Sequence, residues 1–237
     1  MADEDTEPKY QLRVKEDGDV RDTSKHFDGA AVATYLNGDI YDGTFLAGRR
    51  DGTGSYTFSN NGDKYVGGYL ENKRNGMGKF CYGSAYAEPP EDEESAPARG
   101  GEYHGEWAEN KREGGGTFKY VNGDTYSGAW KNGKKHGKGV YRYTRDGSTL
   151  SGKWADGMFV QGTWTLLNGV KYVGSFKWNQ PIGSGVWVFP DGNQLCGSFT
   201  QVEEREEEET TEEEQVSDKP PKSVTVSWKS GVSVRVN

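Results

Sequence analysis

One short pattern recurs along the chain and constrains its fold more than any other feature. It places an aromatic residue, a glycine and a second aromatic residue two positions apart, so that all three point to the same face of an extended strand. The complete copies are Tyr41-Gly43-Phe45, Tyr65-Gly67-Tyr69, Tyr103-Gly105-Trp107, Tyr126-Gly128-Trp130 and Tyr172-Gly174-Phe176. Weaker copies, Leu150-Gly152-Trp154 and Leu195-Gly197-Phe199, begin with leucine. Their starts are 22 to 24 residues apart, except for an interval of 38 after Tyr65. A fixed period of this length indicates a repeat protein.

A second pattern follows each copy, in which paired glycines precede alternating aromatic residues. The segments are Gly52-Gly54-Tyr56-Phe58, Gly76-Gly78-Phe80-Tyr82, Gly114-Gly116-Phe118-Tyr120, Gly137-Gly139-Tyr141-Tyr143 and Gly183-Gly185-Trp187-Phe189. Asn-Gly or Asp-Gly pairs then stand before the next unit, as at Asn61-Gly62, and they favour tight hairpin turns. Each unit therefore predicts a strand, a loop, a strand and a tight turn. Glycine on the ring-bearing face lets a neighbouring ring lie over the backbone.

Composition favours an open sheet over a globular core. Only 32% of the 237 residues are hydrophobic, whereas 35 are glycine, and 14 Tyr, 9 Phe and 7 Trp supply most of the bulk. Because one hairpin is marginal alone, successive units must stack to bury their rings. The expected fold is all-β, an elongated, twisted antiparallel sheet of stacked hairpins.

Four regions are expected from the sequence. Residues 1–26 form an N-terminal strand and extension, and residues 27–200 form the repeat array, with an acidic insert at about 85–100. Residues 201–221 are expected to be a disordered acidic linker, because nine glutamates lie between Glu203 and Glu214. Residues 222–237 are expected to form a hairpin-like tail that turns near Gly231.

The repeat resembles the MORN family, whose units carry YxGxW, a short loop, GxG with an aromatic residue, and NGD. The repeat residues that carry the resemblance are Tyr41, Gly43, Phe45, Tyr65, Gly67, Tyr69, Tyr103, Gly105, Trp107, Tyr126, Gly128, Trp130, Tyr172, Gly174 and Phe176. The unit at Leu150 departs from the pattern, and the unit at Leu195 resembles a terminal cap. MORN enzymes carry a separate catalytic domain, and the segments outside the array are too short for one.

A narrower resemblance is to the MORN-containing radial spoke head proteins of motile cilia. The segment 181–189 in the last full repeat and the glutamate run behind it carry this resemblance. It implies a structural subunit that binds other spoke head subunits and contacts the central pair projections, and it allows two copies per complex. The implied location is the cytoplasm, in the cytoskeleton of the ciliary or flagellar axoneme, where the protein supports control of motility.

Neither catalysis nor a cofactor is expected. His26, His104 and His136 occupy unrelated repeat positions, no Cys, Asp or Glu grouping gives metal-ligand spacing with them, and Cys81 and Cys196 are expected to be structural thiols. The N-terminus lacks the features of a signal peptide, and no stretch of 18 apolar residues is present, which favours a soluble intracellular protein.

Charged residues mark the candidate contact surfaces. Basic pairs recur in the same loop of successive units, at Arg49-Arg50, Lys73-Arg74, Lys111-Arg112 and Lys134-Lys135. They predict a ridge along one sheet edge, and Glu206, Glu207, Glu208 and Glu209 in the acidic run predict a second surface. Protein docking is the leading interpretation. The alternative is a peripheral membrane scaffold that binds anionic lipids through the basic loops. The net charge of -8 and the absence of a reading motif argue against nucleic acid.

Overall fold

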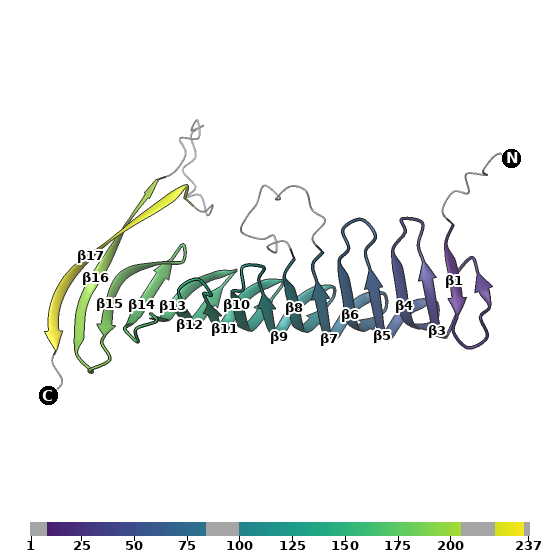
Figure 1. The fold of residues 1–237 in the computed structure, drawn as a ribbon, viewed down its shortest axis with the longest axis horizontal. Helices are drawn as coiled ribbons and strands as arrows, with labels where there is room; N and C mark the ends of the chain where they lie inside the picture. The colour runs from purple at the N-terminus through teal and green to yellow at the C-terminus, as the bar shows by residue number, and fades with distance from the viewer. Residues whose placement is uncertain (1–8, 84–99, 205–220, 235–237) are drawn as a thin grey trace. The chain divides into compact units, whose positions relative to one another are not determined.

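A computed structural model describes residues 9–83, 100–204 and 221–234. These residues form β-strands whose pairings are all antiparallel, so the all-β class and the stacked hairpins are confirmed (Figure 1). The strands are β1 (Gln11–Val14), β2 (Val20–Arg21), β3 (Gly29–Thr34), β4 (Ile40–Leu46), β5 (Arg49–Thr57), β6 (Lys64–Leu70), β7 (Lys73–Cys81), β8 (Glu102–Ala108), β9 (Lys111–Lys119), β10 (Thr125–Lys131), β11 (Lys134–Arg142), β12 (Thr149–Ala155), β13 (Met158–Thr165), β14 (Lys171–Lys177), β15 (Gln180–Val188), β16 (Gln194–Glu204) and β17 (Ser223–Val234). The chain divides into two compact units, residues 1–134 and 135–237.

Unit 1 is a ladder in which each strand pairs with its neighbours in sequence, apart from its N-terminal end. There, β1 lies between β2 and β3, so that β2 is the edge strand. Strands β3 to β10 then follow in chain order, as Figure 1 shows for this part of the chain. Strand β1 lies where the alternation of Tyr10, Leu12 and Val14 predicts a strand.

Unit 2 holds β11 to β17, which also pair in chain order. Its last strand corrects the prediction of a hairpin-like tail, because β17 runs as one strand through Gly231 and pairs with β16 from Ser223 to Val234. Strand β16 in turn extends to Glu204, into the expected linker. The rest of that linker and the acidic insert, at 205–220 and 84–99, lie outside the described residues.

The two kinds of connection in each sequence repeat have exchanged places. We expected a loop between the two strands of a repeat and a tight turn before the next repeat, and the structure shows the reverse. The tight two-residue turns join the two strands of one repeat, for example Ala47-Gly48 between β4 and β5 and Glu109-Asn110 between β8 and β9. Both residues of each turn have positive φ (49° and 78°, 49° and 68°), the geometry of a type I′ turn. The Asn-Gly-Asp segments form the longer connections between successive repeats, such as residues 120–124 between β9 and β10.

The Asn-Gly-Asp connection is built around its aspartate. The Asp39 carboxylate accepts hydrogen bonds from Tyr56 Oη (2.7 Å) and from the Ser59 amide (2.8 Å) of the next repeat. Burial opposes ionisation of Asp39, but these bonds and one from Asn37 hold the pKa of its carboxyl below the ordinary value. Asp63 repeats the contact by accepting a bond from the Gly83 amide (2.7 Å). The aspartates therefore connect each repeat to the next by hydrogen bonds.

A row of glycines crosses the strands of each unit. In unit 1, Gly43 lies opposite Gly54, and the pairing continues through Gly67, Gly78, Gly105, Gly116 and Gly128. In unit 2 the row runs from Gly139 through Gly152, Gly162, Gly174 and Gly185 to Gly197. We call this row the glycine seam. We call the face that carries the repeat rings the inner face and the opposite one the outer face.

The leading tyrosines Tyr41, Tyr65, Tyr103 and Tyr172 lie over the glycine seam. A Cβ added to Gly116 would lie 2.3 Å from Tyr103 Oη, and one added to Gly43 would lie 2.6 Å from the Gly54 Cα. The Tyr103 hydroxyl also donates a hydrogen bond to the Glu106 carbonyl (3.0 Å), and Tyr41, Tyr65 and Tyr126 make the equivalent bond. The seam therefore makes room for a flat ring that its own repeat holds in place.

Candidate protein-docking faces

The repeat residues separate into a buried and a half-buried layer on the inner face. The leading tyrosines Tyr41, Tyr65, Tyr103, Tyr126 and Tyr172 are 0% exposed, and the closing aromatics Phe45, Tyr69, Trp107, Trp130 and Phe176 are at most 6% exposed. Each leading ring meets its closing ring edge to face, as Tyr103 meets Trp107 at a centroid distance of 5.3 Å. These rings form the core, and their glycines lie in the seam.

Rings of the second pattern, most of them half-buried, form a continuous row along unit 1 that Tyr10 and Tyr35 extend at the N-terminal end. The row is Tyr10, Tyr35, Tyr56, Phe58, Phe80, Tyr82, Phe118 and Tyr120, with consecutive centroids 4.4 to 5.9 Å apart. Phe80 and Phe118 are buried, whereas the other members keep part of their surface exposed. We call this set the aromatic row. It presents flat apolar rings and tyrosine edges on the inner face.

The structure divides each predicted basic pair between two environments. The second member, Arg50, Arg74 or Arg112, lies over the rings of the inner face. The Arg74 guanidinium carbon lies 4.5 Å from the Trp107 centroid, and that of Arg112 lies 4.4 Å from the Trp130 centroid. Burial lowers the pKa of Arg74. These arginines border the aromatic row and do not line a ridge.

The same arginines fasten one turn to the next. Arg74 Nη2 donates to the Asn110 carbonyl (3.0 Å), while Asn110 Oδ1 accepts from the Arg74 amide (2.8 Å). Arg50 and Asn72 repeat this arrangement with distances of 2.9 and 2.8 Å. In unit 2, Lys135 lies over the Trp154 ring at 4.6 Å.

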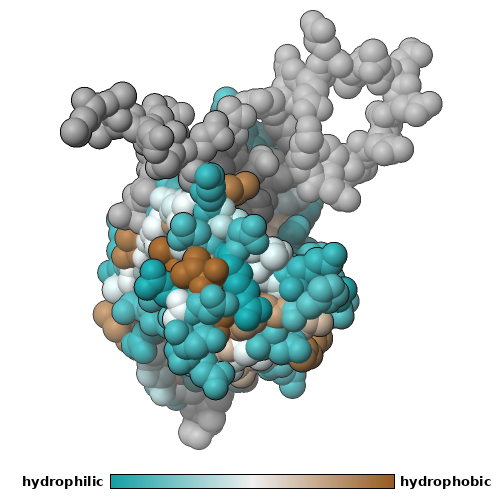
Figure 2. Space-filling model, turned by 90° about the vertical axis from the view of Figure 1, so that its right-hand side faces the viewer, coloured by the Kyte–Doolittle hydropathy of each residue, from teal (hydrophilic) through white to brown (hydrophobic). Residues whose placement is uncertain are grey.

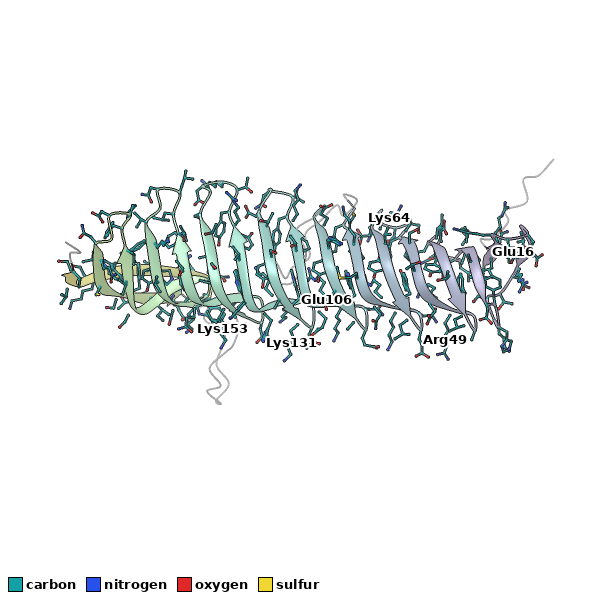
Figure 3. The ribbon with its side chains drawn as sticks, turned by 90° about the horizontal axis from the view of Figure 1, so that it is seen from below. Glu16, Arg49, Lys64, Glu106, Lys131 and Lys153 are labelled. Carbon is teal, nitrogen blue, oxygen red and sulfur yellow. The ribbon has the colours of Figure 1, made fainter. Side chains whose placement is uncertain are left out.

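The first members, Arg49, Lys73, Lys111 and Lys134, are exposed. Arg49 pairs with Glu71 of the next turn (2.7 Å), and Lys73 pairs with Glu109. Figure 3 shows Arg49 on one edge of the strands in unit 1 and Lys64 on the other edge. The turn edge of unit 1 therefore carries mixed charge.

The C-terminal end of unit 2 has its own ring cluster, which joins the weaker copy at Leu195 to a residue outside the repeats. Trp228 of β17 lies against Phe199 at a centroid distance of 4.8 Å. A Cβ added to Gly197 would lie 2.3 Å from Trp228 Cζ2, so this ring lies over the last glycine of the seam. Trp228 thus takes the place that a leading tyrosine has in a complete repeat. The alternation of Val224, Val226 and Trp228 was the signal for it.

The structure describes the start of the acidic run, Glu203 and Glu204. Glu203 Oε1 accepts from Lys177 Nζ (2.6 Å) and from Trp178 Nε1 (3.1 Å), which places the end of β16 beside the β14–β15 turn. Glu206, Glu207, Glu208 and Glu209 lie outside the described residues.

A polar pocket of about 440 Å³ lies at the N-terminal end of unit 1. Glu16, Arg21, His26 and Asp28 contribute charge or polarity to its wall, and Arg21 lies over the Phe27 ring at 5.1 Å. Figure 2 looks onto this end and shows a mainly hydrophilic surface around small hydrophobic patches.

Within residues 9–83, 100–204 and 221–234, no three His, Cys, Asp or Glu side chains cluster in a way that could hold a metal ion. The described part of the chain also has no helix long and apolar enough to cross a membrane.

Comparison with known proteins places this geometry in a family. The MORN repeat model matches residues 41–63, 65–84, 103–125, 126–148 and 172–194. The chain is therefore a MORN-repeat protein. The matches leave out the units at Leu150 and Leu195, although residues 149–165 form the β12–β13 hairpin and bury Leu150 and Trp154.

Two solved structures from Drosophila melanogaster are similar over much of the chain. The TCP domain of SAS-4, solved in complex with a proline-rich motif of Ana2, is 18% identical with a TM-score of 0.41, over 72% of this chain and 84% of that one. The TCP10c domain of Sas-4 is 16% identical with a TM-score of 0.39, over 72% and 93% of the two chains. Likenesses this distant support no inference about function. No curated protein matches the sequence.

Proposed function

We propose that this MORN-repeat protein is a docking scaffold whose aromatic row holds an extended segment of a partner protein. The observation that carries the proposal is the continuous row of half-buried rings in unit 1, bordered by Arg50, Arg74 and Arg112. Large flat rings with polar edges bind extended segments at a low cost in side-chain entropy. The glycine seam and the arginine contacts hold the row in place before a partner arrives, which lowers the entropy cost of binding further.

We propose the radial spoke head of the ciliary axoneme as the setting of this scaffold. The support is the resemblance of the segment 181–189, together with the glutamate run directly behind it. In this setting the partner segment belongs to a neighbouring spoke head subunit, and the scaffold contributes to control of motility.

One experiment tests both parts of the proposal. The tagged chain is expressed in ciliated cells in three forms: wild type, Phe58→Ala with Tyr82→Ala, and Val66→Ala with Met77→Ala. Phe58 and Tyr82 belong to the aromatic row, whereas Val66 and Met77 are 50% and 58% exposed on the outer face. We expect the wild type and the outer-face variant in the axoneme and the aromatic-row variant to be lost from it, with all three folded by circular dichroism. Wild-type signal confined to the cytosol would exclude the axonemal setting, and equal behaviour of the two variants would exclude the aromatic row.

The membrane alternative has less support from the contacts. Arg49 and Lys73 already pair with carboxylates, and Arg50, Arg74 and Arg112 lie over rings. Few cations of these loops are therefore left for lipid head groups. Salt-sensitive co-sedimentation with phosphatidylserine vesicles would restore this alternative.

A further inference from the structure

The outer face of unit 2 carries a group of exposed cations away from the turns. Lys138 and Arg142 lie on β11, Lys153 on β12 and Lys171 on β14, and all four are exposed. Lys153 is labelled in Figure 3. Their positions alternate with the seam glycines Gly139, Gly152 and Gly174 and with buried rings, which places the four side chains on the outer face. We call these four residues the outer basic patch.

The register of the strands in unit 2 places no carboxylate directly opposite these cations. Lys138 lies directly opposite Lys153, Arg142 lies opposite Thr149, and Lys171 lies opposite Thr165 and Val188. Over the described strands β11 to β15, the outer face bears no aspartate or glutamate. The outward positions that lie among the cations include Val140, Thr149, Ser151, Gln161, Thr163, Thr165, Val173, Ser175, Ser184, Val186 and Val188. Lys177, at the end of β14, is already paired with Glu203 of β16.

Unit 1 differs, because its outer face mixes both signs of charge. Lys79 pairs with Glu102 (2.7 Å), Lys15 pairs with Asp42, and Lys119 lies opposite Glu102. Two lysines placed opposite each other on neighbouring strands repel. The arrangement of Lys138 and Lys153 therefore costs stability, and an anion that binds between them would remove that cost.

The surroundings of the patch favour a peptide as the source of that anion. Hydroxyl side chains such as Ser151 and Thr163 lie between the cations, and the large apolar side chains exposed on these strands are Val140 and Val173, at 42% and 44%. Leu167, at 81%, lies off the strands in the β13–β14 connection. The strand surface between the cations therefore lacks the cluster of Trp, Phe or Leu side chains that inserts into a lipid surface, and Leu167 stands alone beside it. The three strand spacings from β11 to β14 span about 14 Å, a distance that about five extended residues cover.

We propose that the outer basic patch binds a glutamate-rich segment of a partner protein. Alternate glutamates of an extended segment are about 7 Å apart, so successive carboxylates can reach successive cations. The surface is distinct from the aromatic row in face and in unit, and the two proposals can fail separately.

Fluorescence anisotropy of a fluorescein-labelled glutamate dodecamer tests the proposal on the full chain. We expect binding at about 50 mM NaCl that weakens strongly by about 300 mM, since screening lengths fall with salt. Lys138→Thr with Lys153→Thr should weaken binding by about fivefold or more, as expected for loss of two contacting charges. The matched control, Lys64→Thr with Lys119→Thr, removes the same charge from the outer face of unit 1 and should change affinity less than about twofold.

A second chain guards against competition from the protein's own glutamate run. In this variant Glu206 to Glu209 and Glu212 to Glu214 are replaced by Gln. Binding of the dodecamer by the wild type or by this variant, with the stated dependence on Lys138 and Lys153, supports the proposal. Absence of binding in both chains, or equal losses in the patch and control variants, overturns it. Binding to phosphatidylserine vesicles without binding to the peptide overturns it in favour of a membrane.

Discussion

At the scale of single residues, the seam glycines and the leading tyrosines depend on each other. Gly116 faces the Tyr103 ring, while its neighbour Gly115 points to the outer face, where a Cβ would meet only Glu106 Oε1 at 3.3 Å. Both glycines lie in β9 without a positive φ. The two positions therefore separate the effect of space from the effect of glycine itself.

We expect Gly116→Ala to lower the free energy of unfolding by about 2 to 3 kcal/mol, because the added methyl overlaps the Tyr103 ring. Gly115→Ala should stay within about 0.5 kcal/mol of the wild type, as surface changes usually do. Urea unfolding followed by tryptophan fluorescence measures both. Equal losses would mean that the ring does not lie over the seam.

The buried tyrosines also predict a response to alkaline pH. Burial raises the pKa of Tyr65 to about 12 and raises those of Tyr41, Tyr103 and Tyr126 as well. Because the folded state favours the neutral phenol, this stability is complete below the unfolded pKa of about 10 and is lost as the pH rises towards the folded value. Thermal midpoints should therefore fall steeply between about pH 10 and 12.

A Tyr65→Phe variant isolates one of these groups. It loses the hydrogen bond to the Gly68 carbonyl (3.0 Å) and should be less stable at neutral pH by about 1 kcal/mol. Its midpoint should nevertheless fall less between about pH 10 and 12 than that of the wild type, because it has one fewer phenol to ionise. An identical pH dependence would show that Tyr65 is not held neutral by burial.

At the scale of the hairpin, the asparagine of the two-residue turn has two roles. Asn110 adopts a φ of 68° and accepts the Arg74 amide through its side chain. We expect Asn110→Gly to lose only the hydrogen bond, at about 1 kcal/mol. Asn110→Ala should cost about 1 kcal/mol more, because alanine is strained at positive φ. Chemical denaturation of the two variants distinguishes the roles, and a less stable glycine variant would contradict this account.

The facing lysines of β11 and β12 give a hairpin-scale prediction of opposite sign. Lys153→Thr should raise the free energy of unfolding by about 0.2 to 1 kcal/mol in the absence of ligand, since it removes the repulsion from Lys138. Lys64→Thr, opposite Cys81 and Thr57, serves as control and should gain nothing. Calorimetry at low salt measures the difference, and a destabilised Lys153 variant would contradict the repulsion.

Hairpins, glycine spacing and the buried ring layer could be predicted because each depends on the two-residue period of a strand. The turns could not be assigned by composition, since Glu109-Asn110 forms a type I′ turn without the Asn-Gly signature. The two-residue period could also have predicted that the two members of each basic pair lie in different environments. Arg49 and Arg50 are consecutive in β5 and must therefore point to opposite faces of the sheet. The single strand β17 was not predictable, because Ser230-Gly231 also suits a turn and only pairing with β16 excludes it.

At the scale of the whole molecule, each strand contacts almost only the strands beside it in its ladder. Stability in such arrays is a sum of repeat and neighbour terms, so a local defect should stay local. We expect Gly116→Ala to speed amide hydrogen exchange most in β8, β9 and β10 and to leave β14 to β16 of unit 2 near wild-type rates. Hydrogen exchange with mass spectrometry measures this decay. Uniform acceleration along the chain would indicate all-or-none unfolding instead.

The seam keeps its register across connections of very different length. Gly78 faces Gly105 across the 20 positions that separate β7 from β8, just as Gly54 faces Gly67 across the six that separate β5 from β6. Strand pairing, and not connection length, therefore fixes the phase of the array. The connections between repeats are accordingly places where evolution can lengthen the chain, or where an engineer can graft a reporter, without shifting a single ring from its glycine.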